Sequence, residues 1–126
     1  MLTDCAVMAT IPASDLDRAI RWYDEKLGFK PVMETEGGVM YQAANGTGFF
    51  IYPTPNAGEA PQTLMSFLTP DVTSEVRDLK ALGVVFEEYD LPGMRTVVSI
   101  ASMPGGRGGW FRDSEGNIIG VFEMQD

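Results

Sequence analysis

The chain of 126 residues contains no histidine, and its only cysteine is Cys5. Histidine is the most frequent metal ligand in proteins and the side chain that most readily exchanges protons near neutral pH. Zinc sites draw their ligands mainly from histidine and cysteine, and the non-haem iron triad requires two histidines. One chain of this composition therefore cannot build either centre. A lone cysteine also cannot form an internal disulfide, which suits a reducing compartment.

Basic side chains are scarce: nine Lys and Arg stand against eighteen Asp and Glu, for a net charge of −9. They are scattered along the chain, whereas a nucleic-acid site needs a basic patch, so we expect no nucleic-acid partner. No apolar run approaches the roughly 20 residues of a membrane span, and the first residues lack the basic and apolar parts of a signal peptide. These absences predict a cytoplasmic protein without a membrane partner. The acidity favours a cationic ligand, although solubility is the simpler explanation.

The size and composition are those of one globular domain covering residues 1–126. Hydrophobic residues make up 44% of the chain and aromatic residues 10%. A domain of this length buries about two-thirds of its unfolded surface, so it can form a core without disulfides.

Two segments, 15–28 and 71–83, have the periodicity of amphipathic helices that end at a glycine. Their apolar stripes are Leu16, Ile20, Tyr23 and Leu27 in the first, and Val72, Val76 and Leu79 in the second. We expect Ser14 to cap the first helix and Asp71 to cap the second, because their side-chain oxygens can accept hydrogen bonds from free backbone N–H groups.

One strand-like run precedes each helix and three follow it, which indicates a duplicated βαβββ unit. The runs are 5–11, 30–36, 39–44 and 48–52 in the first half, and 63–69, 84–89, 109–112 and 117–123 in the second. The first module then covers about 1–53, a proline-rich linker 54–62, and the second module 63–126. An insertion at 90–108, with a strand-like run at 95–100 and a glycine-rich loop at 104–108, is either a lid over a cleft or a surface hairpin.

Three motifs carry a resemblance to a known family: Ser14-Asp-Leu-Asp-Arg-Ala19 with Trp22-Tyr23, Leu27-Gly-Phe29, and Gly109-Trp-Phe-Arg-Asp-Ser-Glu-Gly-Asn117. Together with the duplication, they make the sequence resemble the vicinal oxygen chelate superfamily of glyoxalase I, bleomycin-resistance proteins and extradiol dioxygenases. Ser114 stands where proline is usual. The resemblance implies an α+β fold, in which two tandem βαβββ modules form a curled, cup-like mixed sheet with helices on its outer face.

Metal-dependent members of that family place their ligands on the first and last strands of each module. Offsets from the motifs put Met8, Phe50, Leu64 and Gly120 at these positions. A thioether suits only soft ions, and the other three side chains offer no ligand atom. We therefore expect no metal and no cofactor, although a site of carboxylates alone, for Mg²⁺ or Mn²⁺, stays open.

Strand alternation predicts which side chains face the cup. The residues expected to contact a ligand are Met8, Phe50, Tyr52, Leu64, Ser66, Arg95, Trp110, Gly120 and Phe122. Cys5 and Val7 should face the helices, with Cys5 as a small core residue, while Gly120 should leave room for a ligand. The alternative is that these side chains pack the cup as a second core.

The function that fits best is a metal-free small-molecule binding protein of the glyoxalase/bleomycin-resistance type, a homodimer that holds a hydrophobic or cationic molecule. One alternative is an enzyme of the lyase, isomerase or dioxygenase-like kind. It would use a carboxylate (Asp4, Glu34 or Glu36), the phenol of Tyr52 or a carboxylate-bound metal, with Arg95 stabilising an anion. The other alternative is a non-catalytic interaction module that exposes an apolar patch.

Overall fold

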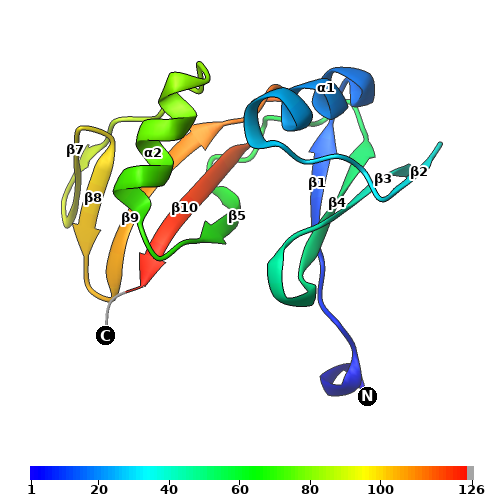
Figure 1. Cartoon of the computed structure of the whole chain (residues 1–126), viewed down its shortest axis with the longest axis horizontal. Coiled ribbons are helices and arrows are strands. Elements are labelled where there is room, and N and C mark those ends of the chain that lie inside the picture. Colours follow the sequence, from blue (N-terminus) through cyan, green and yellow to red (C-terminus); the bar gives the residue numbers. More distant parts are fainter. Residues whose placement is uncertain (125–126) are drawn as a thin grey trace.

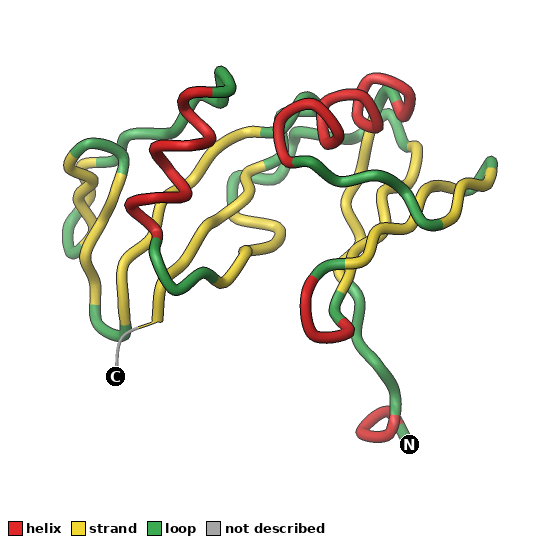
Figure 2. Tube along the Cα trace, in the orientation of Figure 1, coloured by secondary structure: helices red, strands yellow, loops and turns green. Residues whose placement is uncertain are grey.

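The first module forms a four-stranded mixed sheet with one long helix, seen in the computed structural model, which describes residues 1–124 (Figures 1 and 2). Its elements are η1 (Leu2–Asp4), β1 (Ala9–Ala13), α1 (Leu16–Leu27), β2 (Met33–Thr35), β3 (Gly38–Gln42), η2 (Ala44–Gly46) and β4 (Gly48–Pro53). The strand order is β1-β4-β3-β2, with β1 parallel to β4 and the other pairs antiparallel.

The second module forms a six-stranded sheet in the order β5-β10-β9-β8-β7-β6. Its elements are β5 (Thr63–Leu68), α2 (Val72–Ala81), β6 (Asp90–Leu91), β7 (Met94–Val97), β8 (Ile100–Met103), β9 (Gly106–Arg112) and β10 (Ile118–Met124). Strand β5 runs parallel to β10, as β1 does to β4 in the first module. The α+β class is confirmed, and the sheets form two separate units that do not close into a barrel.

Both helices lie where the periodicity predicts them, with one correction at a cap. The first helix is capped by Asp15, whose carboxylate accepts a hydrogen bond from the Arg18 backbone N–H at 3.0 Å, and not by Ser14. Asp71 caps the second helix as expected, accepting from the Ser74 N–H at 3.1 Å. Neither helix is long and apolar enough to cross a membrane, within the described part of the chain.

The helix α1 packs between the two modules. Each module has a buried apolar cluster on the side of its sheet that faces a helix, around Tyr41 and Phe49 in the first and Phe111 and Ile119 in the second. Four partly buried side chains pack against both clusters, namely Trp22, Leu27, Met65 and Phe67. The helix-facing sides of the two sheets are therefore joined into one core through α1 and β5.

The structure corrects two expectations about the strands. Residues 5–8 are not part of β1 but precede it, and Figure 1 shows the N-terminal segment leading away from the sheets. Cys5 is exposed and Val7 is 91% exposed, so neither faces the helices. The physical reason is that the partner strand β4 begins only at Gly48, opposite the residue before Ala9.

The insertion extends the second sheet. Its residues form β6, β7 and β8, and Gly106–Gly108 belong to β9 instead of a loop. The run 84–89 forms no strand. It contributes an isolated bridge between Phe86 and Phe111, a hydrogen bond from the Glu87 N–H to the Trp110 carbonyl at 2.7 Å, and one from the Thr96 N–H to the Tyr89 carbonyl at 2.9 Å. Strand β8 takes the place beside the first half of β9 that a longer strand at 84–89 would occupy.

Candidate functional site

Each of the two sheets has one side that carries no helix. We call these two sides together the helix-free face and assign them by alternation from the buried core residues and by strand register. Its side chains include Thr10, Met33, Met40, Gln42, Phe50 and Tyr52 from the first sheet, and Ser66, Leu68, Met94, Thr96, Met103, Trp110, Phe122 and Met124 from the second. Within the described strands, its one charged residue is Arg112, at the end of β9.

Methionines and aromatic rings dominate this face. It carries five of the eight methionines of the chain. In the first sheet Met33, Met40, Phe50 and Thr10 stand in one cross-strand row. Unbranched methionine side chains adapt their shape to a ligand, and aromatic rings offer large flat contact areas.

Two phenylalanine rings lie flat against glycines of the neighbouring strands. A Cβ atom on Gly38 would come within 2.5 Å of the Phe50 ring, and one on Gly108 within 3.0 Å of the Phe122 ring. Gly38 is required, because its φ is +143° and a Cβ atom would also overlap with the Ile51 carbonyl oxygen. At Gly108 the Phe122 ring would have to shift to admit a larger residue.

A pair of aromatic rings lies on the helix-free side of the second sheet. The rings of Trp110 and Tyr89 meet edge to face with their centroids 5.6 Å apart. The backbone N–H of Tyr89 donates to the Thr96 hydroxyl at 2.8 Å, which ties the loop before β6 to this face. Burial raises the pKa of the Tyr89 phenol, with a further contribution from the Glu87 carboxylate.

The structure brings most of the sequence-predicted residues onto the helix-free face, in two groups. Phe50 and Tyr52 belong to the first sheet, and Ser66, Trp110, Gly120 and Phe122 belong to the second. The space above Gly120 is occupied, because a Cβ atom there would lie 2.5 Å from the Ser66 hydroxyl oxygen.

Three of the predicted residues lie elsewhere. Met8 precedes β1 and is exposed. Leu64 lies where the β5–β10 register shifts, and it packs against the core cluster of the first module. Arg95 points to the opposite side of its sheet from Thr96 and is exposed.

Sequence reasoning did not identify Met33, Met40, Met103 or Tyr89 as part of this surface. Their alternation in short strands is visible in the sequence, but their place depends on which strands pair and in which register. Only the observed pairs, such as Met40 with Phe50 and Met103 with Gly106, establish it.

A second group of polar residues, at the module junction, has perturbed ionisation. The Glu115 carboxylate accepts hydrogen bonds from the Arg18 Nε and Nη2, the Ser14 hydroxyl and the Asp15 N–H, all within 3.2 Å. Although burial opposes it, this shell of donors, led by Arg18, lowers the pKa of Glu115 to about 2. The pKa of Arg18 is raised in turn by the same contact.

The neighbouring Asp113 is also fully engaged. It accepts from the Tyr23 hydroxyl at 2.7 Å, from the Asn117 amide at 3.0 Å and from the backbone N–H groups of Glu115 and Asn117. Burial raises its pKa against these hydrogen bonds, and burial beside Asp113 raises the pKa of Tyr23 well above its usual value. Perturbed pKa values often mark active sites, but these groups are occupied by one another, so the network joins the modules and leaves no group facing a substrate.

The residues at the metal-ligand positions implied by the family resemblance do not fit a divalent ion. Met8 offers a thioether, and Phe50, Leu64 and Gly120 offer no donor atom. Within residues 1–124, no three His, Cys, Asp or Glu side chains are grouped so that they could hold a metal ion. No metal-dependent step can be assigned to these residues.

The comparisons with known proteins agree with this fold. Residues 6–121 match the profile of the Glyoxalase/Bleomycin resistance protein/Dioxygenase superfamily. Comparison with curated proteins finds no match.

Solved structures of similar fold include antibiotic-binding proteins. A bleomycin-binding protein complexed with bleomycin is 18% identical, with a TM-score of 0.73, covering 96% of this chain and 99% of its own. TnmS3, an antibiotic binding protein from Streptomyces sp. CB03234, is 21% identical, with a TM-score of 0.70 and coverages of 97% and 98%. A bleomycin resistance determinant encoded on the transposon Tn5 is 17% identical, with a TM-score of 0.73 and coverages of 97% and 99%.

Proposed function

Because the chain belongs to the Glyoxalase/Bleomycin resistance protein/Dioxygenase superfamily, we propose that it is a metal-free small-molecule binding protein whose ligand lies on the helix-free face. The observation that carries the proposal is the chemistry of that face. In a chain of which 21% of the residues are charged, the face holds methionines, aromatic rings and a few hydroxyl and amide groups. Small-molecule sites are mostly apolar, with a few polar groups that set the orientation of the ligand.

The ligand class is a hydrophobic molecule, cationic or neutral. Related structures are named for binding bleomycin and another antibiotic, which supports a drug-sized ligand. The net charge of −9 attracts cations over long distances, while the uncharged face itself selects for apolar contact area. The exposed Cys5 has no disulfide partner, which is consistent with a reducing cytoplasm.

We further propose that the protein acts as a homodimer in which a second copy covers the helix-free face. Several of its apolar side chains are strongly exposed in the single chain, including Met33, Tyr52, Leu68 and Met124. Contiguous exposed apolar surface on a folded protein usually marks an interface or a ligand site. A cup shared between two copies would use this surface for both purposes.

Tryptophan fluorescence tests the proposal, because Trp110 lies on the helix-free face and Trp22, on α1, packs against the core. Titration with metal-free bleomycin should change the emission of the Trp22→Phe variant and leave that of Trp110→Phe unchanged. Phe50→Ala should weaken binding about tenfold or more, since buried aromatic contacts dominate such sites. The exposed Val85, which lies outside the strands, provides the matched control Val85→Ala.

Equal weakening by Phe50→Ala and Val85→Ala, or no response to bleomycin and to a panel of neutral aromatic antibiotics, would contradict the proposal. Sedimentation equilibrium tests the dimer separately, with a monomer at all concentrations as the contradicting result.

A further inference from the structure

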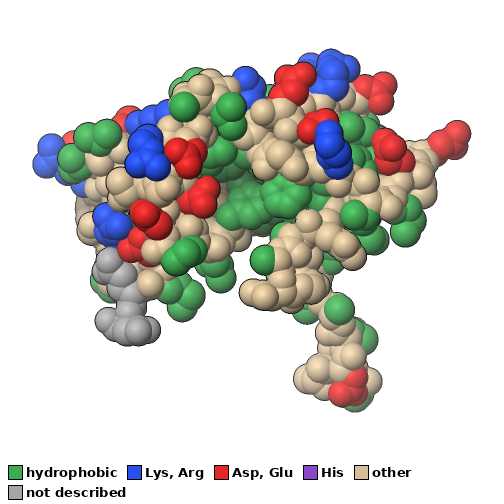
Figure 3. Space-filling view, in the orientation of Figure 1, with side chains coloured by type: hydrophobic (Ala, Val, Ile, Leu, Met, Phe, Trp, Pro, Cys, Tyr) green, Lys and Arg blue, Asp and Glu red, His purple; other side chains and the backbone are tan. Residues whose placement is uncertain are grey.

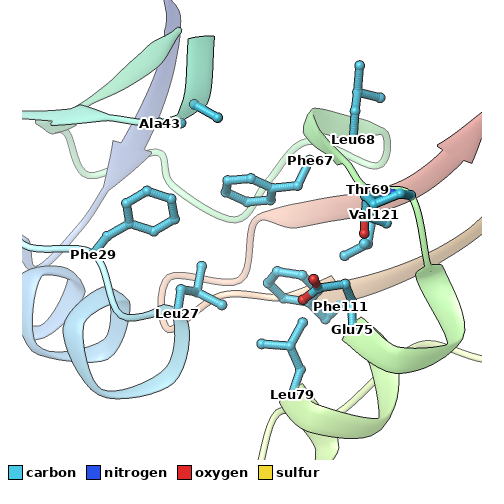
Figure 4. A pocket seen from close by; sticks show the side chains of 12 residues that line it. Leu27, Phe29, Ala43, Phe67, Leu68, Thr69, Glu75, Leu79, Phe111 and Val121 are labelled. Atoms are coloured by element: carbon cyan, nitrogen blue, oxygen red, sulfur yellow. The ribbon is translucent and has the colours of Figure 1, made fainter. Parts of the chain in front are cut away.

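A cavity of about 330 Å³ lies on the other side of the second sheet, between α2, the end of α1 and β5. We call it the junction cavity. Figure 3 shows hydrophobic side chains in the hollow between the two halves of the molecule. Figure 4 shows the side chains of its walls, which include Leu27, Phe29, Phe67, Leu79, Phe111 and Val121.

The junction cavity is separate from the helix-free face. Phe111 and Val121 belong to the core cluster on the helix-facing side of the second sheet, so their neighbours Trp110 and Phe122 point to the opposite side. A ligand in this cavity would therefore share only Leu68 with the surface proposed above, and it would not contact Trp110 or Phe122.

Among residues 1–124, one charged side chain lines the junction cavity, the carboxylate of Glu75 on α2. It is exposed at the mouth and, within residues 1–124, it makes no ion pair and accepts no hydrogen bond. Figure 4 shows Glu75 on α2 among the side chains that line the cavity. No lysine or arginine lines the cavity, so nothing in its walls neutralises Glu75.

The aromatic side chains in the cavity walls also favour a positively charged ligand. The rings of Phe29 and Phe67 are stacked, with centroids 5.7 Å apart and planes inclined by 25°. The faces of aromatic rings attract cations, and an ammonium group gains from a nearby carboxylate as well. The charged group in the described lining is the Glu75 carboxylate, which repels an anion.

We propose that the junction cavity binds a small organic cation, a protonated amine that carries an aromatic or branched aliphatic body. The apolar body fills the space between Leu27, Phe67 and Leu79, and the ammonium group lies at the mouth against Glu75. The cavity volume of about 330 Å³ is at the lower end of the range for small-molecule sites, so the ligand is smaller than a typical drug.

Trp22 reports on this cavity, because its ring lies 6.0 Å from that of Phe111, centroid to centroid. The test uses the full chain with Trp110→Phe, so that Trp22 is its one tryptophan. The probes are 4-phenylbutylammonium and its neutral analogue 4-phenylbutan-1-ol. The ammonium probe should change the Trp22 emission and bind more tightly than the alcohol.

The matched pair of variants is Glu75→Gln and Glu36→Gln. Both change the net charge by one, and Glu36 is exposed in the turn between β2 and β3, away from the cavity. Glu75→Gln should weaken binding of the ammonium probe about three- to fivefold, as expected for one partly exposed charge pair, and leave binding of the alcohol unchanged. Glu36→Gln should change neither.

Equal effects of the two variants, or tighter binding of the alcohol, would overturn the proposal. So would a response that is confined to Trp110 in the Trp22→Phe variant, since it would place the probe on the helix-free face. Loss of probe binding as the protein concentration rises would show that a second copy of the chain fills the cavity, and would also overturn it.

Discussion

At the scale of single residues, two stacked tyrosines in the first module show how differently buried hydroxyl groups can be placed. Their ring centroids are 6.0 Å apart. Tyr23 donates to Asp113 at 2.7 Å, whereas the buried Tyr41 hydroxyl has no hydrogen-bond partner within the described residues. Burial raises the pKa of Tyr41 to about 12, so it stays neutral at physiological pH.

Removal of the two hydroxyl groups should have different effects on the free energy of unfolding. Tyr23→Phe should lower the free energy of unfolding by about 1–3 kcal/mol, because it leaves the buried Asp113 carboxylate without one of its donors. Tyr41→Phe removes a hydroxyl that makes no hydrogen bond, so it should be neutral or slightly stabilising. Urea denaturation of both variants measures the difference, and equal losses would contradict this assignment.

The Glu115 carboxyl should make stability depend on pH in the acid range. Its pKa is lowered from 4.5 to about 2 in the folded protein, so its contribution is complete above about pH 4.5 and is lost as the pH falls towards 2. The lowered pKa corresponds to about 3 kcal/mol of folding free energy. This value is an upper limit, because solvent screens the half-exposed Arg18 partner. Asp113 acts in the opposite direction, since its raised pKa favours proton uptake by the folded state.

The Glu115→Gln variant separates the effect of Glu115 on stability from that of Asp113, because it removes only the Glu115 carboxyl group. The wild-type protein should exceed the variant in stability at pH 7, and the difference should shrink between pH 4.5 and 2. Chemical denaturation of both proteins across this range provides the measurement. A difference that stays constant with pH would show that Glu115 does not ionise as described.

At the scale of elements, the pairing of β5 with β10 depends on one close approach. Gly120 stands opposite Ser66, and a Cβ atom on Gly120 would lie 2.5 Å from the serine hydroxyl oxygen but 3.4 Å from its Cβ. An alanine at position 120 would therefore overlap only with the Ser66 hydroxyl group, and the two backbones leave enough room for its methyl group.

Gly120→Ala should destabilise the protein by about 1–2 kcal/mol through this overlap. The double variant Gly120→Ala with Ser66→Ala should recover most of the loss, because ordinary van der Waals contact remains once the hydroxyl is gone. A double-mutant cycle by thermal denaturation gives the coupling energy. Additive effects of the two substitutions would argue against this packing.

At the scale of the whole molecule, stability should not depend on divalent metal. The chain has no histidine, and residues 1–124 contain no cluster of potential ligands. A ligand that binds only the folded state raises the melting temperature by mass action. The melting temperature should therefore be unchanged by EDTA or by added Zn²⁺, Mn²⁺ or Mg²⁺ in calorimetry, and a rise of several degrees with one of these ions would contradict the metal-free interpretation.

Much of the fold could be predicted from the sequence because its signals are local. Helix α1 follows from a stripe such as Leu16, Ile20 and Tyr23, and its end follows from Gly28, which adopts a left-handed conformation with φ of 76°. The prediction of Ser14 as the cap was wrong, because both side chains can accept the same hydrogen bond and Ser14 instead donates to Glu115 from the other module.

The linear pattern was sufficient for the two helices and for the lack of histidine, since these depend on periodicity and on which residue types are present, while the family resemblance implied the α+β class. The three-dimensional arrangement alone decided that residues before Ala9 have no partner strand, that Leu64 packs in the other module's core, and that five methionines lie on the helix-free sides of the two sheets. It also created the junction cavity, whose walls come from both modules. These features depend on contacts between residues far apart in the chain, which neither periodicity nor composition records.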